Sequence, residues 1–366
     1  MGDELRPRQA AESGAFQRSS GLRRQQRTVD RALSQLALQD LHEVKLLLRG
    51  ESVVDWHRLY LSSEDEARRI LALAALDADD PDDQRRMASV RAQAVEYVRS
   101  DLRLHLDEEV ATQGSMLDLL LLASREGKLQ RSACVLLKVM HLMYHLDARE
   151  LRTALAIPDQ ELFALVEESV VAMFDELRSA GVPVAEFSWS RKTRSSQLTK
   201  LLVKKATVAA QIFDRLRFRV VVEHPSDLAA TLHVMLHQCI PFNYVLPGQT
   251  VNNLVDMKRL DPVKTLEVAD DDDRPLVESN EFTSDKFRVL NFVADLPIRV
   301  DEMIAAQEGA PEDRGSVVFV LAEFQVLDKA TADANEQGES AHHRYKYRQH
   351  GRVKERLLRT PVKGKK

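Results

Sequence analysis

Two polar side chains stand at the end of an apolar strand pattern near the C-terminus. Residues 316–326 read SVVFVLAEFQV, a run of β-branched and aromatic residues that predicts a strand. Alternation places Glu323 and Gln325 on the same face as Val317 and Phe319. A carboxylate at the end of a buried strand is rigidly held, and it can ligate a metal or accept a proton. The alternative is that Glu323 simply reaches solvent there.

A second carboxylate opens another strand pattern, DRLRFRVVV, in which three arginines follow at alternate positions. The segment starts at Asp214, and its arginines are Arg215, Arg217 and Arg219. A covered sheet does not bury three unpaired cations on one face, so these side chains need a carboxylate or a phosphate. Asp214 and Glu323 could together hold one Mg²⁺, which favours one or two carboxylates plus substrate phosphates. Pairing of the arginines with aspartates at an exposed sheet edge is the alternative.

Two further segments carry groups that suit a nucleotide. Residues 190–205, SRKTRSSQLTKLLVKK, gather cations around two serines at an expected helix start, where phosphate oxygens bind well. A solvated basic helix face is the plain alternative. In residues 287–295, FRVLNFVAD, alternation puts Phe287 and Asn291 on one face, where they could stack on and hydrogen-bond a base. An ordinary core phenylalanine is the alternative there.

The elements that must position these groups fall into two parts. Three- and four-residue apolar spacing predicts helices from about residue 30 to 180, the last of them ending at Gly181. Strands are expected at 217–224, 239–246, 287–295 and 316–326, with helices at 195–211, 225–238 and 330–346 between them or after them. The segment 248–285 is expected to be a long loop. Alternating helices and strands predict a sheet layered with helices.

Composition narrows the class of protein. The 366 residues carry a net charge of −5, and 44% of them are hydrophobic, which is typical of a soluble globular chain. Two cysteines, Cys134 and Cys239, argue against a disulfide scaffold and fit a reducing cytoplasm. The sequence shows neither a secretory signal nor an apolar run long enough for a membrane span. The histidine pairs His141/His145 and His233/His237 lack a third ligand, so we expect structural histidines rather than zinc.

The order of these segments resembles the synthetase domain of the RelA/SpoT alarmone synthetases over about residues 165–349. The family has a strand ending in Glu-x-Gln, followed by a helix reading Ala-Glu-x-Gly-x-x-Ala-His-x-x-Tyr-Lys. The corresponding stretch here begins Glu323-Phe-Gln325 and continues through residues 335–346, without a gap. Its matching helix residues include His342, Tyr345 and Lys346.

Three shorter motifs follow the same order. DRLRFRVVV is similar to the family's Asp-x-x-Ala/Gly-x-Arg, which aligns Asp214 and Arg219. The ATP-gripping motif Arg-x-Lys-x-x-x-Ser-x-x-x-Lys is matched at Lys192, Ser196 and Lys200, with Arg191 beside the place of the motif arginine, which is Ser190 here. The acceptor loop Gly-Tyr-x-Ser-x-His becomes KFRVLN, with Phe287 for the tyrosine and Asn291 for the histidine.

The resemblance implies an α+β, nucleotidyltransferase-like fold, a mixed sheet flanked by helices, for the synthetase domain (165–349). The residue patterns outside it predict a flexible tail (1–28), an all-helical N-terminal domain that could be regulatory (29–164) and a basic C-terminal tail (350–366). The implied reaction is ATP-dependent transfer of pyrophosphate to the 3′-hydroxyl of a guanine nucleotide. Asp214 and Glu323 would hold Mg²⁺, and Glu323 would help deprotonate the acceptor.

The remaining roles also come from the resemblance. Lys192, Lys200 and Arg219, supported by Ser196 and Arg191, would bind ATP. The acceptor would lie against Phe287, Asn291 and Gln325. The basic run at 344–366 fits contact with tRNA or the ribosome, although a disordered solubilising tail is the more common explanation of such a run. A homo-oligomer is compatible with the sequence, and no membrane partner is expected.

Departures from the family motifs keep other functions open. The acceptor loop lacks the Gly, Tyr and His of the motif, and Leu327-Asp328 replaces the Arg-Thr that follows Glu-x-Gln. The acceptor could therefore be an adenine nucleotide or a tRNA 3′ end, as in toxin-like relatives. A non-catalytic nucleotide- or RNA-binding protein on the same fold is a second alternative, and an unrelated α/β domain on a helical scaffold is a third. The helical half has no His-Asp hydrolase motif.

Overall fold

The computed structural model describes residues 38–179, 181–204, 212–255, 286–307, 314–337 and 342–358. The predicted tail 1–28 and most of the predicted loop 248–285 lie outside these ranges. Helices make up the first part of the described chain. They are α2 (Leu38–Arg49), α3 (Glu64–Leu73), α4 (Pro81–Glu96), α5 (Glu108–Thr112), α6 (Met116–Ser124), α7 (Gln130–Ala154) and α8 (Asp159–Ser179), with short turns at Val53–Asp55 and Tyr97–Asp101.

Local sequence explains where several of these helices begin and end. Ser63 caps α3 by accepting a hydrogen bond from the backbone N–H of Glu66, and Asp80 caps α4 directly before Pro81. Gly181 follows α8 with a φ of +81°, and its N–H bonds to the carbonyl of Arg178. This left-handed conformation suits glycine and ends the helix, as the sequence predicts.

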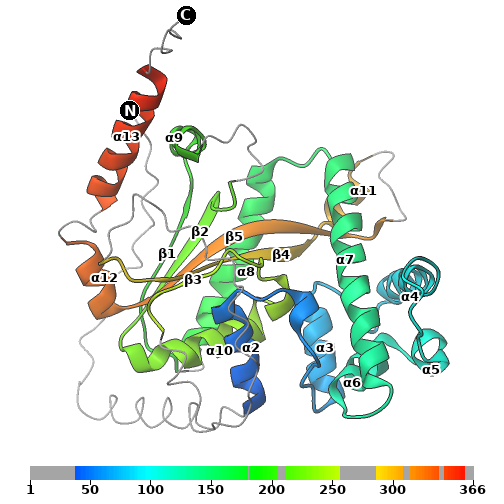
Figure 1. Cartoon of the computed structure of the whole chain (residues 1–366). Helices are drawn as coiled ribbons and strands as arrows, with labels where there is room; N and C mark the ends of the chain where they lie inside the picture. The colour runs from blue at the N-terminus through cyan, green and yellow to red at the C-terminus, as the bar shows by residue number, and fades with distance from the viewer. Residues whose placement is uncertain are drawn as a thin grey trace, which may run out of the picture.

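The second part contains a five-stranded mixed sheet in the order β1-β2-β5-β4-β3 (Figure 1). The strands are β1 (Val184–Arg191), β2 (Leu216–Val222), β3 (Val251–Asn252), β4 (Leu290–Arg299) and β5 (Val317–Asp328). β2 and β5 run parallel, whereas the other neighbouring pairs are antiparallel. The helices are α9 (Arg194–Lys204), α10 (Leu228–Gln238), α11 (Asp301–Ala305), α12 (Lys329–Asn335) and α13 (His342–Leu358), with 3₁₀ turns at Pro225–Asp227 and Phe242–Tyr244. The predicted α+β class, a helical part followed by a mixed sheet with helices, is confirmed.

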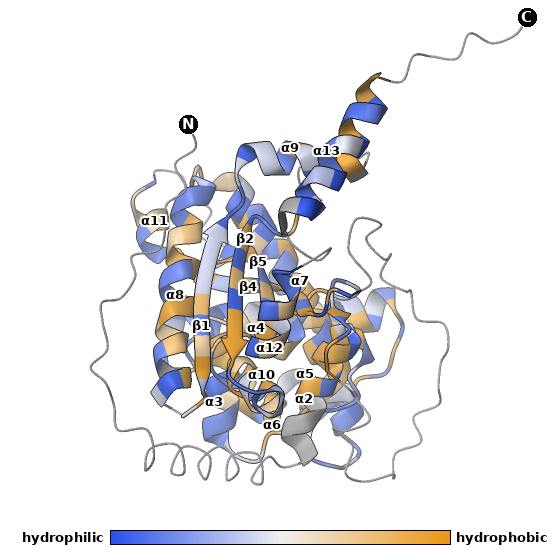
Figure 2. Cartoon of the chain, turned by 90° about the vertical axis from the view of Figure 1, so that its left-hand side faces the viewer, coloured by the Kyte–Doolittle hydropathy of each residue, from blue (hydrophilic) through white to orange (hydrophobic). Residues whose placement is uncertain are grey.

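One face of the sheet is fully apolar and forms the main core. Its central aromatic residues, Phe218, Phe292 and Phe324, stack across β2, β5 and β4 with ring centroids 5.3 Å apart. Helices α8 and α10 supply much of the opposing core, with contributions from α2 and the end of α7. In Figure 2, α8 runs beside this face of the sheet. Burial of these side chains is the largest stabilising contribution on this side of the sheet.

The other face of β5 changes character along the strand, as the alternation predicts. Its first residues, Val317 and Phe319, pack into the core of the helical part. His145 of α7 stacks on Phe319, with 4.1 Å between ring centroids. Further along the same face come Glu323 and Gln325. The helical part therefore covers the apolar end of this face and leaves the polar end to a different set of side chains.

Several sequence predictions of secondary structure were wrong. The segment predicted as a loop from residue 248 contains the short strand β3 (Val251–Asn252). Residues 239–246 form a 3₁₀ turn and one isolated bridge instead of a strand, because Pro241 lacks the N–H that a sheet requires. The edge strand β1 was missed. The helix expected at 330–346 is two helices, α12 and α13, and the interval between them contains Gly338, a poor helix former.

Candidate functional site

Asp214 and Glu323 come together through one arginine. Arg217 of β2 lies directly opposite Glu323 of parallel β5. Its Nε donates to Oε2 of Glu323, and its Nη2 lies 3.5 Å from Oδ2 of Asp214. Asn291 of β4 donates to the other oxygen of Glu323 over 3.0 Å. Both carboxylates are buried, with 7% of Asp214 and 6% of Glu323 exposed.

Two lysines complete what we call the carboxylate–cation cluster, which consists of Lys192, Lys200, Asp214, Arg217 and Glu323. Nζ of Lys192 donates to Oδ2 of Asp214, and Nζ of Lys200 donates to Oδ1 over 2.6 Å. Burial alone would raise the pKa of Asp214, but the two ammonium groups hold that pKa well below its usual range. Three cations thus face two carboxylates, and the cluster is formally positive.

Burial also acts on the cations of this cluster. It lowers the pKa of Lys192 despite the attraction of Asp214, with repulsion from Lys200 adding to the effect. Burial would lower the pKa of Arg217 as well, but the negative charge of Glu323 outweighs it and raises that pKa. Arg217 is therefore held as a charged guanidinium.

Helix α9 carries Lys200, and both of its ends are fixed. Thr193 caps the N-terminus by accepting from the N–H of Ser196 over 3.3 Å, and it donates to the Ser196 hydroxyl over 3.0 Å. At the other end, Arg356 of α13 donates to the carbonyl of Leu202 over 2.9 Å and to that of Val203. These contacts satisfy terminal groups of the helix and hold α9 beside α13 (Figures 1 and 2).

Each of the three arginines on the β2 segment pairs with a carboxylate. Arg215 contacts Asp159 of α8 over 2.6 Å, and Arg217 bridges the buried pair. Arg219 reaches Glu336, which directly follows α12, over 3.5 Å, and the Glu336 side chain is 68% exposed. The long distance and the solvated partner make Arg219 the most readily released of the three. β2 is flanked by β1 and β5, so this pairing does not occur at a sheet edge.

The other predicted ATP-binding arginine is engaged elsewhere. Arg191, at the end of β1, makes two hydrogen bonds to Glu167 of α8, at 2.7 and 2.8 Å. The structure thus brings Lys192, Lys200 and Asp214 together, while Arg191 faces α8.

The predicted acceptor residues occupy neighbouring positions on three elements. Gln325 of β5 lies between Arg219 of β2 and Asn291 of β4 in the strand register. Phe287 precedes β4 instead of belonging to it, which corrects the predicted strand start, and its side chain is half-buried. A polar row from Arg219 to Asn291 therefore continues the cluster along the same sheet face.

Two asparagines, which the sequence analysis missed, hold the segment before β4. Asn335 of α12 donates to the carbonyl of Arg288 over 2.6 Å and accepts from its N–H over 3.1 Å. Asn253 donates to the carbonyl of Phe287 over 2.9 Å and accepts from the N–H of Val289 over 2.7 Å. These side chains replace strand pairing where Phe287 lies. The burial of Asn335 depends on tertiary packing, so the sequence offered no signal for it.

The last predicted motif residues belong to α13. His342 is the first residue of that helix. The hydroxyl of Tyr345 accepts from Gln349 over 2.8 Å, and Tyr345 lies near Arg217. Lys346 is exposed.

Asp214 and Glu323 fit Mg²⁺ in their ligand chemistry, because both supply buried carboxylate oxygens near cations suited to phosphate. Their oxygens are also contacted by Lys192, Lys200, Arg217 and Asn291. Among the described residues, no group of three or more His, Cys, Asp or Glu side chains could hold a metal. A divalent cation at the pair would depend on two carboxylates and would compete with the guanidinium of Arg217.

The histidine pairs have structural surroundings. His141 stacks on Tyr244 with ring centroids 4.9 Å apart, and burial lowers its pKa to about 3. Burial and the neighbouring His233 lower the pKa of His237 to about 3 as well.

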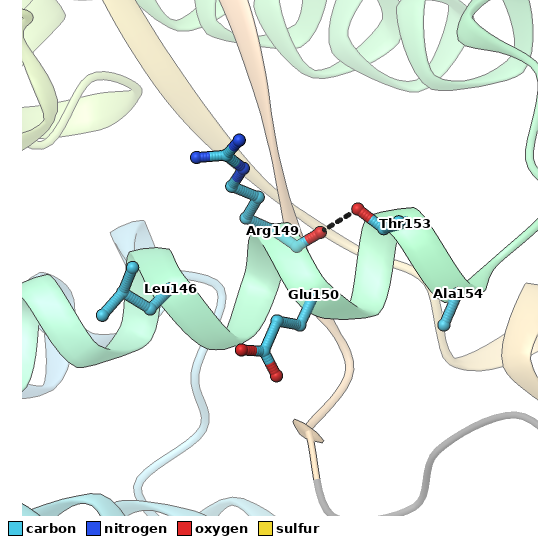
Figure 3. Close-up of a pocket in the computed structure, with 5 residues that line it drawn as sticks. All are labelled: Leu146, Arg149, Glu150, Thr153 and Ala154. Atoms are coloured by element: carbon cyan, nitrogen blue, oxygen red, sulfur yellow. Dashed lines mark hydrogen bonds between the residues drawn. The ribbon is translucent and has the colours of Figure 1, made fainter.

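A separate hollow lies along α7 and is lined by Leu146, Arg149, Glu150, Thr153 and Ala154 (Figure 3). Its lining comes from one helix and contains none of the predicted site residues. No helix in the described part of the chain is long and apolar enough to cross a membrane.

Comparison with known proteins gives structural neighbours alone. No protein-family model matches the chain, and no curated protein does. The small alarmone synthetase 1 from Bacillus subtilis is similar at 13% identity and a TM-score of 0.29, covering 54% of this chain and 91% of that one. A GTP pyrophosphokinase family protein from Streptococcus pneumoniae matches at 11% identity and a TM-score of 0.31, covering 54% and 83%. The small alarmone synthetase 2 from Bacillus subtilis is similar at 14% identity and a TM-score of 0.29, covering 57% of this chain and 97% of that one. At such TM-scores we draw the function from this chain's own side chains.

Proposed function

We propose that this protein transfers the β,γ-pyrophosphate of ATP to the 3′-hydroxyl of a guanine nucleotide, as the RelA/SpoT-like motifs imply. The observation that carries the proposal is the carboxylate–cation cluster, where Lys192, Lys200 and Arg217 surround two buried carboxylates on one sheet face. A formally positive site of this kind attracts a polyphosphate, and Arg219 next to it pairs with Glu336, an exposed partner.

Glu323 is the proposed general base. In the reaction, a bond forms between the 3′-oxygen of the acceptor and the β-phosphorus of ATP. The bond from that phosphorus to the α,β-bridging oxygen breaks, so AMP leaves, and the hydroxyl proton passes to Glu323. Asn291 fixes one oxygen of the Glu323 carboxylate, which suits proton transfer at a defined position.

The lysines and arginines act on charge. Lys192 and Lys200 converge on Asp214 from the turn after β1 and from α9, so both lie within reach of the same phosphate chain. Placed cations stabilise the negative charge that shifts between phosphates during transfer. Mg²⁺, held by Asp214 and Glu323, would add to this charge neutralisation.

Two other functions have a specific observation in their favour. An adenine nucleotide or a tRNA 3′ end would serve as acceptor through the same cluster, and α13 favours RNA because it exposes Lys346 together with Tyr347, which is 81% exposed. A non-catalytic nucleotide-binding protein is favoured by the guanidinium of Arg217 between the two carboxylates.

The deciding experiment measures transfer directly. Purified protein is incubated with Mg²⁺, γ-labelled ATP and, in separate reactions, GDP, GTP, AMP, ADP or bulk tRNA, with Glu323→Gln run beside each. Label on a guanine nucleotide with the wild type alone supports the proposal. Label on tRNA or an adenine nucleotide assigns a different acceptor. If the protein binds ATP but transfers label to none of these acceptors, the result supports a non-catalytic nucleotide-binding protein instead of an enzyme.

A further inference from the structure

One guanidinium lies between the two buried carboxylates. Nε of Arg217 contacts Glu323, and Nη2 lies 3.5 Å from Asp214. The strand register enforces this placement, because Arg217 and Glu323 are direct partners across β2 and β5. A cation that ligated both carboxylates would have to take up the same oxygens. The geometry therefore sets a metal and this guanidinium in competition.

The charges around the pair strengthen the competition. Lys192 and Lys200 already contact both oxygens of Asp214, and the third cation, Arg217, gives the cluster a positive formal charge. A divalent cation entering this arrangement meets repulsion from three positive groups in a partly desolvated place. Removal of the Arg217 charge would leave two cations against two carboxylates.

The sequence position of Arg217 is also unusual. The motif Asp-x-x-Ala/Gly-x-Arg, which aligns Asp214 and Arg219, has a small residue at the third position after the aspartate, and Arg217 stands there. A small residue at this point of β2 would leave the space beside Glu323 open. The arginine fills it with a guanidinium, and 35% of the Arg217 side chain as a whole is exposed.

We infer that Arg217 excludes a divalent cation from Asp214 and Glu323 while no nucleotide is bound. The relevance of the metal rests on the proposed function. Phosphate oxygens accept two parallel hydrogen bonds from a guanidinium, so a bound phosphate chain offers Arg217 another partner. The departure of Arg217 toward that chain frees Oε2 of Glu323 and removes one of the two cations near Oδ2 of Asp214. Entry of the metal is thereby coupled to entry of the nucleotide.

The test measures Mn²⁺ binding to the full chain without nucleotide, from the loss of the free-ion signal in electron paramagnetic resonance. Arg217→Met removes the charge and keeps much of the side-chain length. Arg217→Gln also removes the charge but keeps a hydrogen-bond donor beside Glu323, and it serves if the first variant does not fold. Arg215→Met is the matched control, because Arg215 pairs with Asp159 instead of the cluster. The double variant Arg217→Met with Glu323→Gln locates any site that is gained.

We expect Arg217→Met to bind Mn²⁺ at least about tenfold more tightly than the wild type, a change that corresponds to about 1.4 kcal/mol. The control should match the wild type, and the double variant should lose the gain. Equal Mn²⁺ affinity in wild type and both Arg217 variants would overturn the inference, as would a gain that survives Glu323→Gln. Because the Mn²⁺ measurement contains no nucleotide, a failed transfer assay would contradict the proposed function without changing the Mn²⁺ affinities.

Discussion

Arg217 and Glu323 face each other across parallel strands β2 and β5, and the guanidinium Nε donates to the carboxylate. The same guanidinium approaches Asp214, so two acidic groups that lie 109 residues apart in sequence share one cation. Glu323 is buried, with 6% of it exposed, on the sheet face opposite the aromatic core. Strand register therefore builds the cluster, and the surrounding helices only add cations to it.

Replacement of Glu323 by glutamine should abolish transfer while ATP binding persists. Glutamine keeps the size of the side chain and its contact with Asn291, but it cannot accept the hydroxyl proton. General-base catalysis contributes about 100-fold or more to rate, so the turnover should fall at least that far. Labelled-ATP transfer measures the loss, and equilibrium binding of a non-hydrolysable ATP analogue measures what remains.

Glu336→Gln is the matched control for this substitution. Glu336 follows α12, and its exposed carboxylate contacts Arg219 at 3.5 Å. Its turnover should stay close to that of the wild type. If Glu323→Gln retained wild-type turnover, Glu323 would not be the base.

Asp214 should make the stability of the protein depend on acid pH. Its native pKa lies below the ordinary value, because Lys192 and Lys200 outweigh the effect of burial. The unfolded chain therefore takes up a proton near pH 4, before the native protein does. The stabilising contribution is complete above about pH 4 and is lost as the pH falls toward the native pKa.

Asp214→Asn removes that contribution. Near neutral pH the free energy of unfolding of the variant should be about 3 kcal/mol lower than that of the wild type, since two ammonium groups lose their partner. Below about pH 4 the difference from the wild type should narrow by about 1.4 kcal/mol for each pH unit. Urea denaturation between pH 5 and pH 3 checks this, with the exposed Asp333→Asn as control. Parallel curves for wild type and Asp214→Asn would contradict the assigned lysine contacts.

The sequence predicted the parts of the site that depend on alternation and motif spacing. Period-two patterning placed Glu323 and Gln325 on one face, and the three arginines of the β2 segment were expected to need anions, which they have. The bridging role of Arg217 was not predicted, because it depends on the parallel register of β2 with β5. That register is a long-range property that no local pattern encodes.

The prediction of secondary structure from sequence was wrong at segments whose conformation depends on tertiary contacts. The edge strand β1 was missed, and its segment VAEFSWSR becomes a strand by pairing with β2. Residues 239–246 have strand-like composition, but Pro241 and the turn at Phe242–Tyr244 prevent pairing beyond one bridge. The hydrogen bonding of Asn335 to the backbone of Arg288 likewise requires α12 to lie next to the segment before β4. Side chains of this kind become visible only in the folded chain.

Arg356 should control the rigidity of α9, and through it the position of Lys200. Its guanidinium supplies hydrogen bonds to the carbonyls of Leu202 and Val203 at the end of that helix. Arg356→Ala leaves these acceptors without this donor, at a cost of about 1 kcal/mol. Hydrogen exchange of the amides in α9 should become several-fold faster. Lys354→Ala on the same helix is the control, because the Lys354 side chain is exposed. Unchanged exchange in α9 would rule out this bracing role.

Phe287 should determine affinity for the acceptor and not for ATP. Its half-buried ring precedes β4, where Asn253 and Asn335 hold the backbone on both sides of it. Stacking of an aromatic side chain on a base contributes about 1–3 kcal/mol, so Phe287→Ala should raise the KM for the acceptor about tenfold or more. The KM for ATP should change little, because ATP is assigned to the cations of the cluster. Phe287→Tyr keeps the ring and should restore the acceptor KM, which separates stacking from loss of folding. An equal rise in both KM values, unrelieved by tyrosine, would instead make Phe287 a packing residue.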